Sequence, residues 1–237
     1  VLEPDELAAL QQRIDAIMLG QADVDYEHLM MQLDSTTGAT ADAGPQSNGF
    51  KGPTLAYRKI ENLELDALFR EFMARPLFRS ICAHVYGAEV PVSSYRAMFM
   101  NKPARQGTHL PWHQDRWQAL DRDPLVTVWT ALDPATVANG CVQVIDGSHR
   151  EGVINPDHPS GWLTEQQAHR YCPPEKIVHL ELEPGEAVLL HNWLLHASEV
   201  NGTDIARRAF SVCYMDGRTV NVSSGTAYPL LFEPPAA

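Results

Sequence analysis

The clearest chemical candidates in this sequence are a histidine and an aspartate two positions apart. His113 and Asp115 lie in Trp-His-Gln-Asp at 112–115, just before a β-rich segment. Side chains at i and i+2 of an extended strand project to the same side, so one imidazole and one carboxylate can reach a single ion. Taken alone the pair is weak evidence, because a surface histidine beside a turn aspartate has the same sequence. A metal site needs a third ligand from elsewhere.

A third ligand is available in the segment 185–212, where one hydrophobic strand ends near His191 and another begins near His196. Two imidazoles and one carboxylate on one face of a metal leave three positions open. Non-haem Fe(II) oxygenases use this arrangement to bind a bidentate cosubstrate and O₂. Catalytic zinc needs only one open position, so the same ligands do not by themselves exclude zinc.

An arginine follows this histidine at a spacing that suits an organic acid. Arg207 lies eleven residues after His196, beyond the turn signal Asn201-Gly202. A hairpin of that size brings the two residues into one neighbourhood. A guanidinium is a planar fork that matches a carboxylate at two points. A dicarboxylic oxoacid would therefore chelate iron at one end and contact Arg207 at the other.

At these positions the sequence resembles the phytanoyl-CoA dioxygenase family of Fe(II)- and 2-oxoglutarate-dependent oxygenases, over roughly residues 98–215. Four blocks carry the resemblance: WHQD at 112–115, VTVWTALDPATVANGCVQVIDGSHR at 126–150, the distal histidine that opens His-Ala-Ser, and the arginine eleven residues later. Together these blocks are far more specific than any one of them.

The resemblance implies the roles of particular residues. The implied iron ligands, which form the catalytic centre, are His113, Asp115 and His196. His191 is left as a packed or supporting histidine, because its spacing to the arginine does not fit. The implied cosubstrate-binding residues are Arg207, Trp129, Thr127 and Ser198.

The resemblance also implies the reaction. Iron, 2-oxoglutarate as cosubstrate and O₂ would oxidise a small organic metabolite, by hydroxylation or oxidative cyclisation. In halogenating relatives a small residue replaces the metal-binding carboxylate, and Asp115 fills that position here. Natural-product and sugar intermediates are candidate substrates, with secondary metabolism and antibiotic biosynthesis as the favoured context. Desaturation and epoxidation use the same ligands, so outcome and substrate stay open.

Two other classes of function fit parts of the pattern. A zinc-dependent jelly-roll hydrolase would use the ligands but would need no carboxylate clamp like Arg207. A non-catalytic, small-molecule-binding jelly roll would be marked by a broken ligand triad, whereas all three candidate ligands are present.

Several other residues near these motifs are weaker candidates, because each has an ordinary structural explanation. Tryptophans could form a substrate wall, although core packing explains a tryptophan more often. Basic residues could receive an anionic group of a substrate, although most are simply solvated. The residues concerned are Trp112, Trp117, Trp162, Arg105, Arg116, Arg122, Lys102 and the turn histidine His149.

The whole chain favours a single domain over residues 1–237, mainly β with flanking helices. Residues 91–216 contain short β-rich runs separated by turn signals, which predict a double-stranded β-helix, a cupin-like jelly roll. Residues 1–90 are expected to be largely helical, and 147–176 to form a lid-like insertion. The predicted helices are 4–18, 61–75 and 76–87, and residues 35–52 are predicted to be a mobile loop.

Charge and composition limit the partners. A net charge of −12 opposes binding to nucleic acid, which needs clustered basic residues. No apolar run is long enough to span a membrane, and the start has no signal-peptide pattern. The cysteines form no close pairs, which suits a reducing cytoplasm. A small-molecule substrate is the expected partner, and the sequence leaves the oligomeric state open. The four cysteines are Cys82, Cys141, Cys172 and Cys213.

Overall fold

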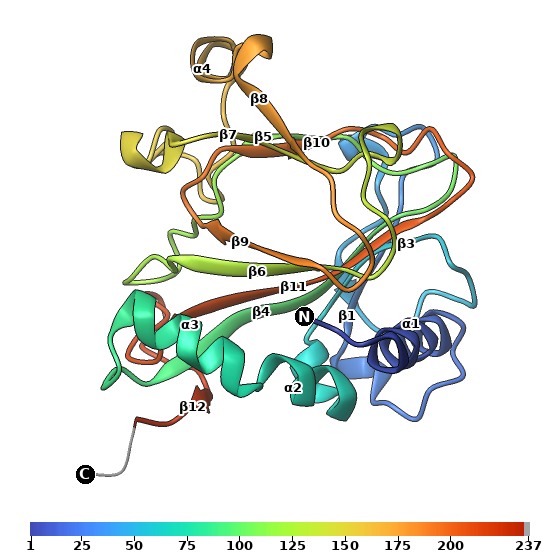
Figure 1. Cartoon of the computed structure of the whole chain (residues 1–237), viewed down its shortest axis with the longest axis horizontal. Helices are drawn as coiled ribbons and strands as arrows, with labels where there is room; N and C mark the ends of the chain where they lie inside the picture. Colours follow the sequence, from blue (N-terminus) through green and yellow to red (C-terminus); the bar gives the residue numbers. More distant parts are fainter. Residues whose placement is uncertain (235–237) are drawn as a thin grey trace.

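Two facing β-sheets form the framework of this protein, with the helices of the first 90 residues on the outer side of the larger sheet (Figure 1). The computed structural model describes residues 1–234. The helices are α1 (Pro4–Met18), α2 (Ala67–Met73), α3 (Pro76–Tyr86) and α4 (Glu165–Tyr171). The strands are β1 (Met30–Leu33), β2 (Ser47–Asn48), β3 (Tyr57–Glu61), β4 (Val92–Lys102), β5 (Leu110–His113), β6 (Val126–Ala131), β7 (Val142–Ile145), β8 (Ile177–Leu180), β9 (Ala187–His191), β10 (His196–Ser198), β11 (Arg207–Asp216) and β12 (Leu230–Phe232).

Both sheets are antiparallel. The larger sheet has the order β2-β1-β3-β4-β11-β6-β9, with β12 pairing β4 at one end, and the smaller has the order β5-β10-β7-β8. Neighbouring strands come from distant parts of the chain, as in a jelly roll. Among the described residues the two sheets stay separate and do not close into a barrel. The predicted mainly β, double-stranded β-helix architecture is confirmed.

The larger sheet is covered on both faces, and the continuous apolar sequence of its strand β6 reflects this. All six residues of β6 are buried, because helices lie against one face and the smaller sheet faces the other (Figure 1). A strand buried on both sides needs a continuous apolar run rather than alternation. On the helical side, Ile14 of α1 and Phe69 of α2 pack in one core with Phe210 of β11.

A second core lies between the sheets. It contains Trp129 and Ala131 of β6, Val142 and Val144 of β7, and Ala209 of β11. These side chains occupy only part of the space between the sheets. The rest is the cavity that holds the candidate site.

The first 90 residues contain more β-structure than their sequence predicts. Helix α1 begins and ends as predicted, but β1, β2 and β3 extend the larger sheet within residues 30–61. The expectation of a largely helical region is therefore wrong there. The segments 30–33 and 47–48 contain no β-branched residue, so they lack the composition that marks the equally short strands after residue 90. The predicted helix at 61–75 is also shorter, because Asp66 accepts hydrogen bonds from the amides of Leu68 and Phe69 and begins α2 at residue 67.

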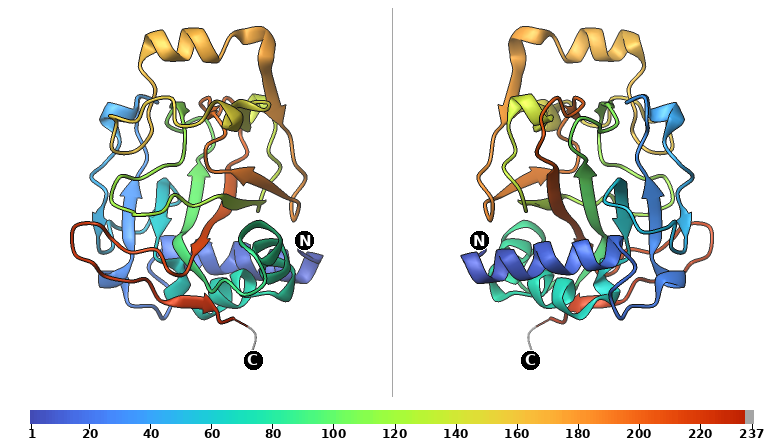
Figure 2. Two further views of the ribbon diagram at one scale, coloured as in Figure 1. Left: turned by 90° about the vertical axis from the view of Figure 1, so that its left-hand side faces the viewer. Right: turned by 90° about the vertical axis from the view of Figure 1, so that its right-hand side faces the viewer.

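The two predicted loops have structure of their own. Residues 35–52 include a 3₁₀ turn and β2, and their mobility stays a prediction. The insertion at 147–176 carries α4, which lies on the outer side of the smaller sheet (Figure 2). Within residues 1–234, none of the helices is long and apolar enough to cross a membrane.

Candidate active site

Two adjacent strands of the smaller sheet bring the predicted metal ligands together. His113 ends β5 and His196 begins β10, and the two are paired in the antiparallel register. Their ring centroids are 4.0 Å apart. Asp115 follows β5, with its Oδ1 4.0 Å from Nε2 of His113 and its Oδ2 3.8 Å from Nε2 of His196. One ligand atom from each residue lies within 4.8 Å of the others.

Backbone carbonyls fix which nitrogen of each imidazole faces this group. Nδ1 of His113 lies 2.8 Å from the carbonyl of Pro111, and Nδ1 of His196 lies 2.9 Å from the carbonyl of Leu194. A carbonyl only accepts, so Nδ1 carries the proton and Nε2 keeps its lone pair. Burial, followed by the neighbouring His196, lowers the pKa of His113 to about 3. The imidazole is therefore neutral, which is the form that binds a metal.

The triad opens into a cavity of about 360 Å³ between the two sheets. All four predicted cosubstrate residues line this cavity: Thr127, Trp129, Ser198 and Arg207. Thr127 and Trp129 project from the same face of β6, as alternation requires. The structure thus brings every predicted site residue into one space.

Arg207 is a buried cation whose side chain lacks an acidic partner. The residue is 2% exposed, and its Nε and Nη1 have no hydrogen-bond partner in the described part of the chain. The guanidinium lies 5.3 Å from the ring centroid of Trp129. Burial lowers the pKa of Arg207 to about 10, so the side chain remains charged at neutral pH. An unpaired buried charge is costly, so the position suits an anionic ligand.

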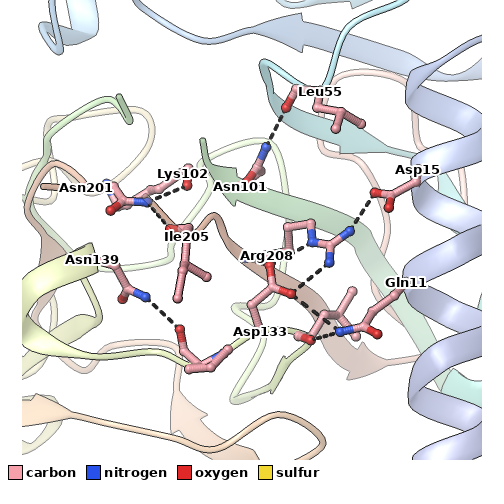
Figure 3. Close-up of polar contacts among 12 residues, drawn as sticks. Gln11, Asp15, Leu55, Asn101, Lys102, Asp133, Asn139, Asn201, Ile205 and Arg208 are labelled. Atoms are coloured by element: carbon pink, nitrogen blue, oxygen red, sulfur yellow. Dashed lines mark hydrogen bonds and ion pairs between the residues drawn. The ribbon is translucent and has the colours of Figure 1, made fainter. Parts of the chain in front are cut away.

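The adjacent arginine has the opposite environment. Nε of Arg208 lies 2.7 Å from Oδ2 of Asp133, and Nη1 lies 2.5 Å from Oδ1 of Asp15 on α1 (Figure 3). Successive residues of β11 point to opposite faces. Arg208 therefore links the sheet to the helical layer, while the side chain of Arg207 lines the cavity.

A second buried basic side chain, that of Lys102, lies beside Arg207. Lys102 is 4% exposed, is paired with Arg207 in the register of β4 and β11, and lines the cavity. Its Nζ donates to the carbonyl of Thr108 at 2.6 Å. Burial, followed by the charge of Arg207, lowers the pKa of Lys102 to about 6. The Asn201 side chain holds the backbone at this point by donating to the Lys102 carbonyl at 3.0 Å (Figure 3).

Two positioning residues were not evident from the sequence. The amide of Asp115 donates to the carbonyl of Asn192 at 2.7 Å, which holds the carboxylate segment against the loop before β10. Gln114 is fully buried and donates to the carbonyls of Gly152 and Trp193 at 2.8 and 2.7 Å. No motif marks either residue, because their roles depend on backbone partners that are distant in sequence.

Some of the weaker candidates for site residues line the cavity, and the others lie elsewhere in the molecule. Trp117 and Trp162 line the cavity, and Trp162 stacks on His113 with centroids 5.0 Å apart. Trp112 packs in a separate cluster under the insertion. His149 and His191 stack on each other at 4.9 Å, outside the ligand triad. The arginines Arg105, Arg116 and Arg122 contact surface acids at Asp204, Asp123 and Asp121.

The donor set and its surroundings fit an iron site with a dicarboxylate beside it. Two imidazoles, each with Nδ1 bonded to a backbone carbonyl, and one carboxylate converge, and no fourth protein ligand joins them among the described residues. The unpartnered guanidinium of Arg207 lines the same cavity.

Comparison with known proteins identifies the family. The sequence profile described as phytanoyl-CoA dioxygenase (PhyH) matches residues 1–209. The chain belongs to the phytanoyl-CoA dioxygenase family. A probable phytanoyl-CoA dioxygenase of Caenorhabditis elegans is 29% identical over 197 residues, which are 78% of this chain and 63% of that protein. The human peroxisomal phytanoyl-CoA dioxygenase is 31% identical over 129 residues, 51% of this chain and 38% of that protein. The chain spans less than two thirds of the length of these family members.

Solved structures of similar fold support this framework. EctD from S. alaskensis, solved with 2-oxoglutarate and 5-hydroxyectoine, aligns with a TM-score of 0.68 and 21% identity, covering 100% of this chain and 79% of that one. SnoK, a non-heme alpha-ketoglutarate-dependent carbocyclase from nogalamycin biosynthesis, aligns with a TM-score of 0.66 and 18% identity, covering 100% of this chain and 87% of that one. At these identities the likeness shows the fold of this phytanoyl-CoA dioxygenase family member.

Proposed function

We propose that this protein is an Fe(II)- and 2-oxoglutarate-dependent oxygenase that oxidises a small organic metabolite. One observation carries the proposal: a His-Asp-His triad and a buried arginine with unpartnered nitrogens line the same cavity. Family membership supports it, since the matched family is described as a dioxygenase family. A zinc hydrolase has no use for the buried guanidinium of Arg207.

The roles of the residues follow from their surroundings. His113, Asp115 and His196 would hold the iron, with each histidine oriented by a backbone carbonyl. When bound, iron and 2-oxoglutarate would together supply oxidation by O₂: one oxygen atom enters succinate as CO₂ is released, and the other enters the substrate in hydroxylation or leaves as water in oxidative cyclisation. Arg207 would bind the far carboxylate of 2-oxoglutarate through its planar fork, and Lys102 places a second basic side chain at that end.

The remaining lining prepares the cavity for this chemistry. Trp129 lies under the guanidinium of Arg207 and holds it in place. Thr127 and Ser198 place hydroxyl groups on the wall, beside the apolar side chains of Val142 and Leu190. The apolar part of the wall excludes water and strengthens the electrostatic interactions of the charged groups beside it.

The substrate we favour is an intermediate of secondary metabolism, hydroxylated or oxidatively cyclised at a C–H bond. The support comes from two proteins of the same fold, one solved with 5-hydroxyectoine and the other described as a carbocyclase of nogalamycin biosynthesis. We also propose a reducing compartment such as the cytoplasm. All four cysteines are buried and free of disulfides, which suits that environment.

Cosubstrate turnover tests the proposal. Purified protein supplied with Fe(II), O₂ and 2-oxoglutarate is expected to release succinate, and a screen of candidate metabolites should find compounds that accelerate the release. Replacing iron with zinc, or His196 with alanine, should abolish it. Equal activity with zinc, or a hydrolytic product formed without 2-oxoglutarate, would contradict the proposed function.

A further inference from the structure

The cavity is basic although the protein is acidic. The chain carries a net charge of −12, yet only one carboxylate, Asp115, belongs to the cavity lining. A cluster of one charge in a recessed site attracts ligands of the opposite sign. Among the described residues, five basic side chains line the cavity: Arg58, Lys59, Arg96, Lys102 and Arg207.

One of these basic residues, Arg96, lies apart from Lys102 and Arg207 along β4. Lys102 and Arg207 are paired in register at one end of the cavity, and Arg96 is paired with Cys213 further along the same two strands. Arg96 and Lys102 are separated by six residues and share one face of β4. At about 3.3 Å per residue, their Cα atoms are roughly 20 Å apart. Arg96 is therefore distinct from the proposed cosubstrate end.

Arg96 has free hydrogen-bonding capacity. Its guanidinium carbon lies 4.8 Å from the ring centroid of Trp117 and 5.5 Å from that of Tyr95. Its nearest acid is Glu61, whose Oε2 is 3.7 Å from Nε, beyond hydrogen-bond distance. The Arg96 side chain is 27% exposed. Stacking on a ring orients a guanidinium without using its N–H donors.

Glu61 is already committed to other partners. Its Oε1 accepts from Nζ of Lys59 at 2.9 Å and from Nε2 of Gln46 at 2.8 Å. Gln46 in turn accepts from Lys59 at 2.9 Å. This triangle neutralises Lys59 and leaves the N–H donors of Arg96 without a hydrogen-bond partner among the described residues.

The two basic residues of β3 lie nearer the cosubstrate end. Lys59 is paired in register with Met100, two residues from Lys102. Arg58 donates to Oε1 of Gln32 at 2.8 Å and lies in the field of Asp34. Arg96 is therefore the basic side chain of the lining that lies away from that end, and a single guanidinium matches a single carboxylate.

We propose that Arg96 binds a carboxylate of the organic substrate, so that the substrate is a carboxylic acid whose apolar body contacts Trp117 and Met98. This deepens the proposed function and rests on it, because the cosubstrate must occupy the other end. The two methionines of β4 that line the cavity between the charged ends, Met98 and Met100, offer an apolar surface to the body of such a molecule.

A matched pair of probes tests the proposal directly. Protein is loaded anaerobically with Fe(II) and saturating 2-oxoglutarate, and its visible absorption band is recorded. 3-Phenylpropanoate and the uncharged 3-phenylpropanamide are then titrated by calorimetry at one ionic strength. We expect the carboxylate to bind at least about tenfold more tightly than the amide, since hydrogen bonds to a charged group are among the stronger ones. The absorption band should persist, which shows that the probe does not displace 2-oxoglutarate.

Variants of Arg96 show whether this residue causes the tighter binding of the carboxylate probe. Arg96→Gln should abolish it while keeping the absorption band, and Arg96→Lys should retain part of it through charge alone. Arg170→Gln is the matched control, because Arg170 also lies over an aromatic ring, Tyr171 at 5.1 Å, but outside the cavity. The control should behave as the unmodified protein does.

The outcomes separate the two proposals. A missing absorption band in the unmodified protein contradicts the proposed function itself. A normal band without preference for the carboxylate, whether both probes bind or neither does, overturns the role of Arg96 alone. An equal preference in the Arg96→Gln protein with an intact band overturns it as well.

Discussion

At the scale of single residues, two adjacent arginines show how strand alternation divides tasks. Arg208 is paired with Asp133 and Asp15 and belongs to the structural framework. Arg207 faces the cavity with two nitrogens unpartnered. Folding leaves that guanidinium buried without an acid, so a ligand carboxylate has a large favourable interaction available there.

Arg207→Ala should weaken 2-oxoglutarate binding and leave iron binding nearly unchanged. Loss of a buried charged partner costs about 2 kcal/mol or more, which is roughly a 30-fold rise in Kd. Anaerobic titration of the iron-loaded protein with 2-oxoglutarate gives this Kd, and a separate metal titration gives the iron affinity. The Kd of the Arg207→Lys protein for 2-oxoglutarate should lie between those of the unmodified and Arg207→Ala proteins. Lysine keeps the positive charge but lacks the planar fork of the guanidinium. An unchanged Kd for 2-oxoglutarate would contradict the role of Arg207.

The binding of 2-oxoglutarate should depend on pH because of Lys102. Its pKa in the free protein is lowered to about 6 by burial and then by Arg207. A bound dianion beside it raises this pKa, so above pH 6 binding takes up a proton. Affinity is then full below pH 6 and falls as pH rises, by at most about tenfold per unit. Titrations at pH 6, 7 and 8 measure the slope, and Lys102→Met should flatten it. A slope that survives in Lys102→Met would assign the proton to another group.

Single site residues could be predicted from the sequence only where they belong to a motif. His113, Asp115, His196 and Arg207 were identified from residue type and spacing, and the structure brings them together. Their metal-binding and carboxylate-binding roles remain predictions. Arg96 could not be singled out, because its position over Trp117 depends on two segments that only the fold brings together.

At the scale of elements, the short strands β5 and β10 position the candidate metal ligands, and the insertion at 147–176 contacts the segment that carries two of them. The β5–β10 pairing aligns the two histidines, and residue 161 of the insertion lies against the segment between His113 and Asp115. The amide of Gln114 donates to the carbonyl of Gly161 at 3.1 Å. The insertion is therefore part of the support of the ligand triad.

Gly161→Ala should disturb the metal site. Gly161 has φ +73°, and a Cβ there would lie 2.2 Å from the carbonyl oxygen of Gln114. The insertion or the ligand segment must move, and a displacement of about 1 Å near a reacting centre can lower activity about 100-fold. Succinate release and iron affinity measure the effect.

Gly147→Ala is the matched control for this change. Gly147 has φ +71°, but nothing lies within 4 Å of a Cβ built there. Its cost should be about 1–2 kcal/mol of stability from the left-handed backbone alone, with iron affinity retained. Equal losses of iron affinity in the two variants would show that backbone strain, not contact with Gln114, is responsible.

Elements with a clear composition or period were predictable, whatever their length. The apolar run of β6 and the periodic apolar positions of α1 agree with the structure. The strands β1 to β3 were not predicted. Met30–Leu33 contains no β-branched residue, unlike the equally short Val142–Ile145. These strands matter, because β3 supplies Arg58 and Lys59 to the cavity.

At the scale of the whole molecule, the helical layer is fastened to the sheet by charge as well as by packing. Asp133 is 7% exposed and accepts hydrogen bonds from Nε and Nη2 of Arg208 at 2.7 and 2.8 Å (Figure 3). The same guanidinium reaches Asp15 on α1. The network links three segments that are far apart in sequence and lies on the side of the sheet opposite the cavity.

Asp133→Ala should destabilise the fold without altering the site. It leaves Arg208 with Asp15 as its remaining acidic partner, and breaking a largely buried pair costs about 3 kcal/mol. For a chain of this size the unfolding midpoint should fall by roughly 6–12 °C. Iron affinity at low temperature should stay the same. Asp204→Ala breaks an exposed pair, with side chains 64% and 78% exposed, and should leave the midpoint nearly unchanged. Similar midpoints in both variants would contradict the structural role of Asp133.

The most direct test of the central claim is the visible absorption that appears when 2-oxoglutarate chelates Fe(II) in the protein. Under anaerobic conditions the unmodified protein should develop a metal-to-ligand charge-transfer band on addition of both. His196→Ala should lose this band. His191→Ala should keep it, because His191 stacks on His149 outside the ligand triad. No band in the unmodified protein, or an unchanged band in His196→Ala, would contradict the proposed site.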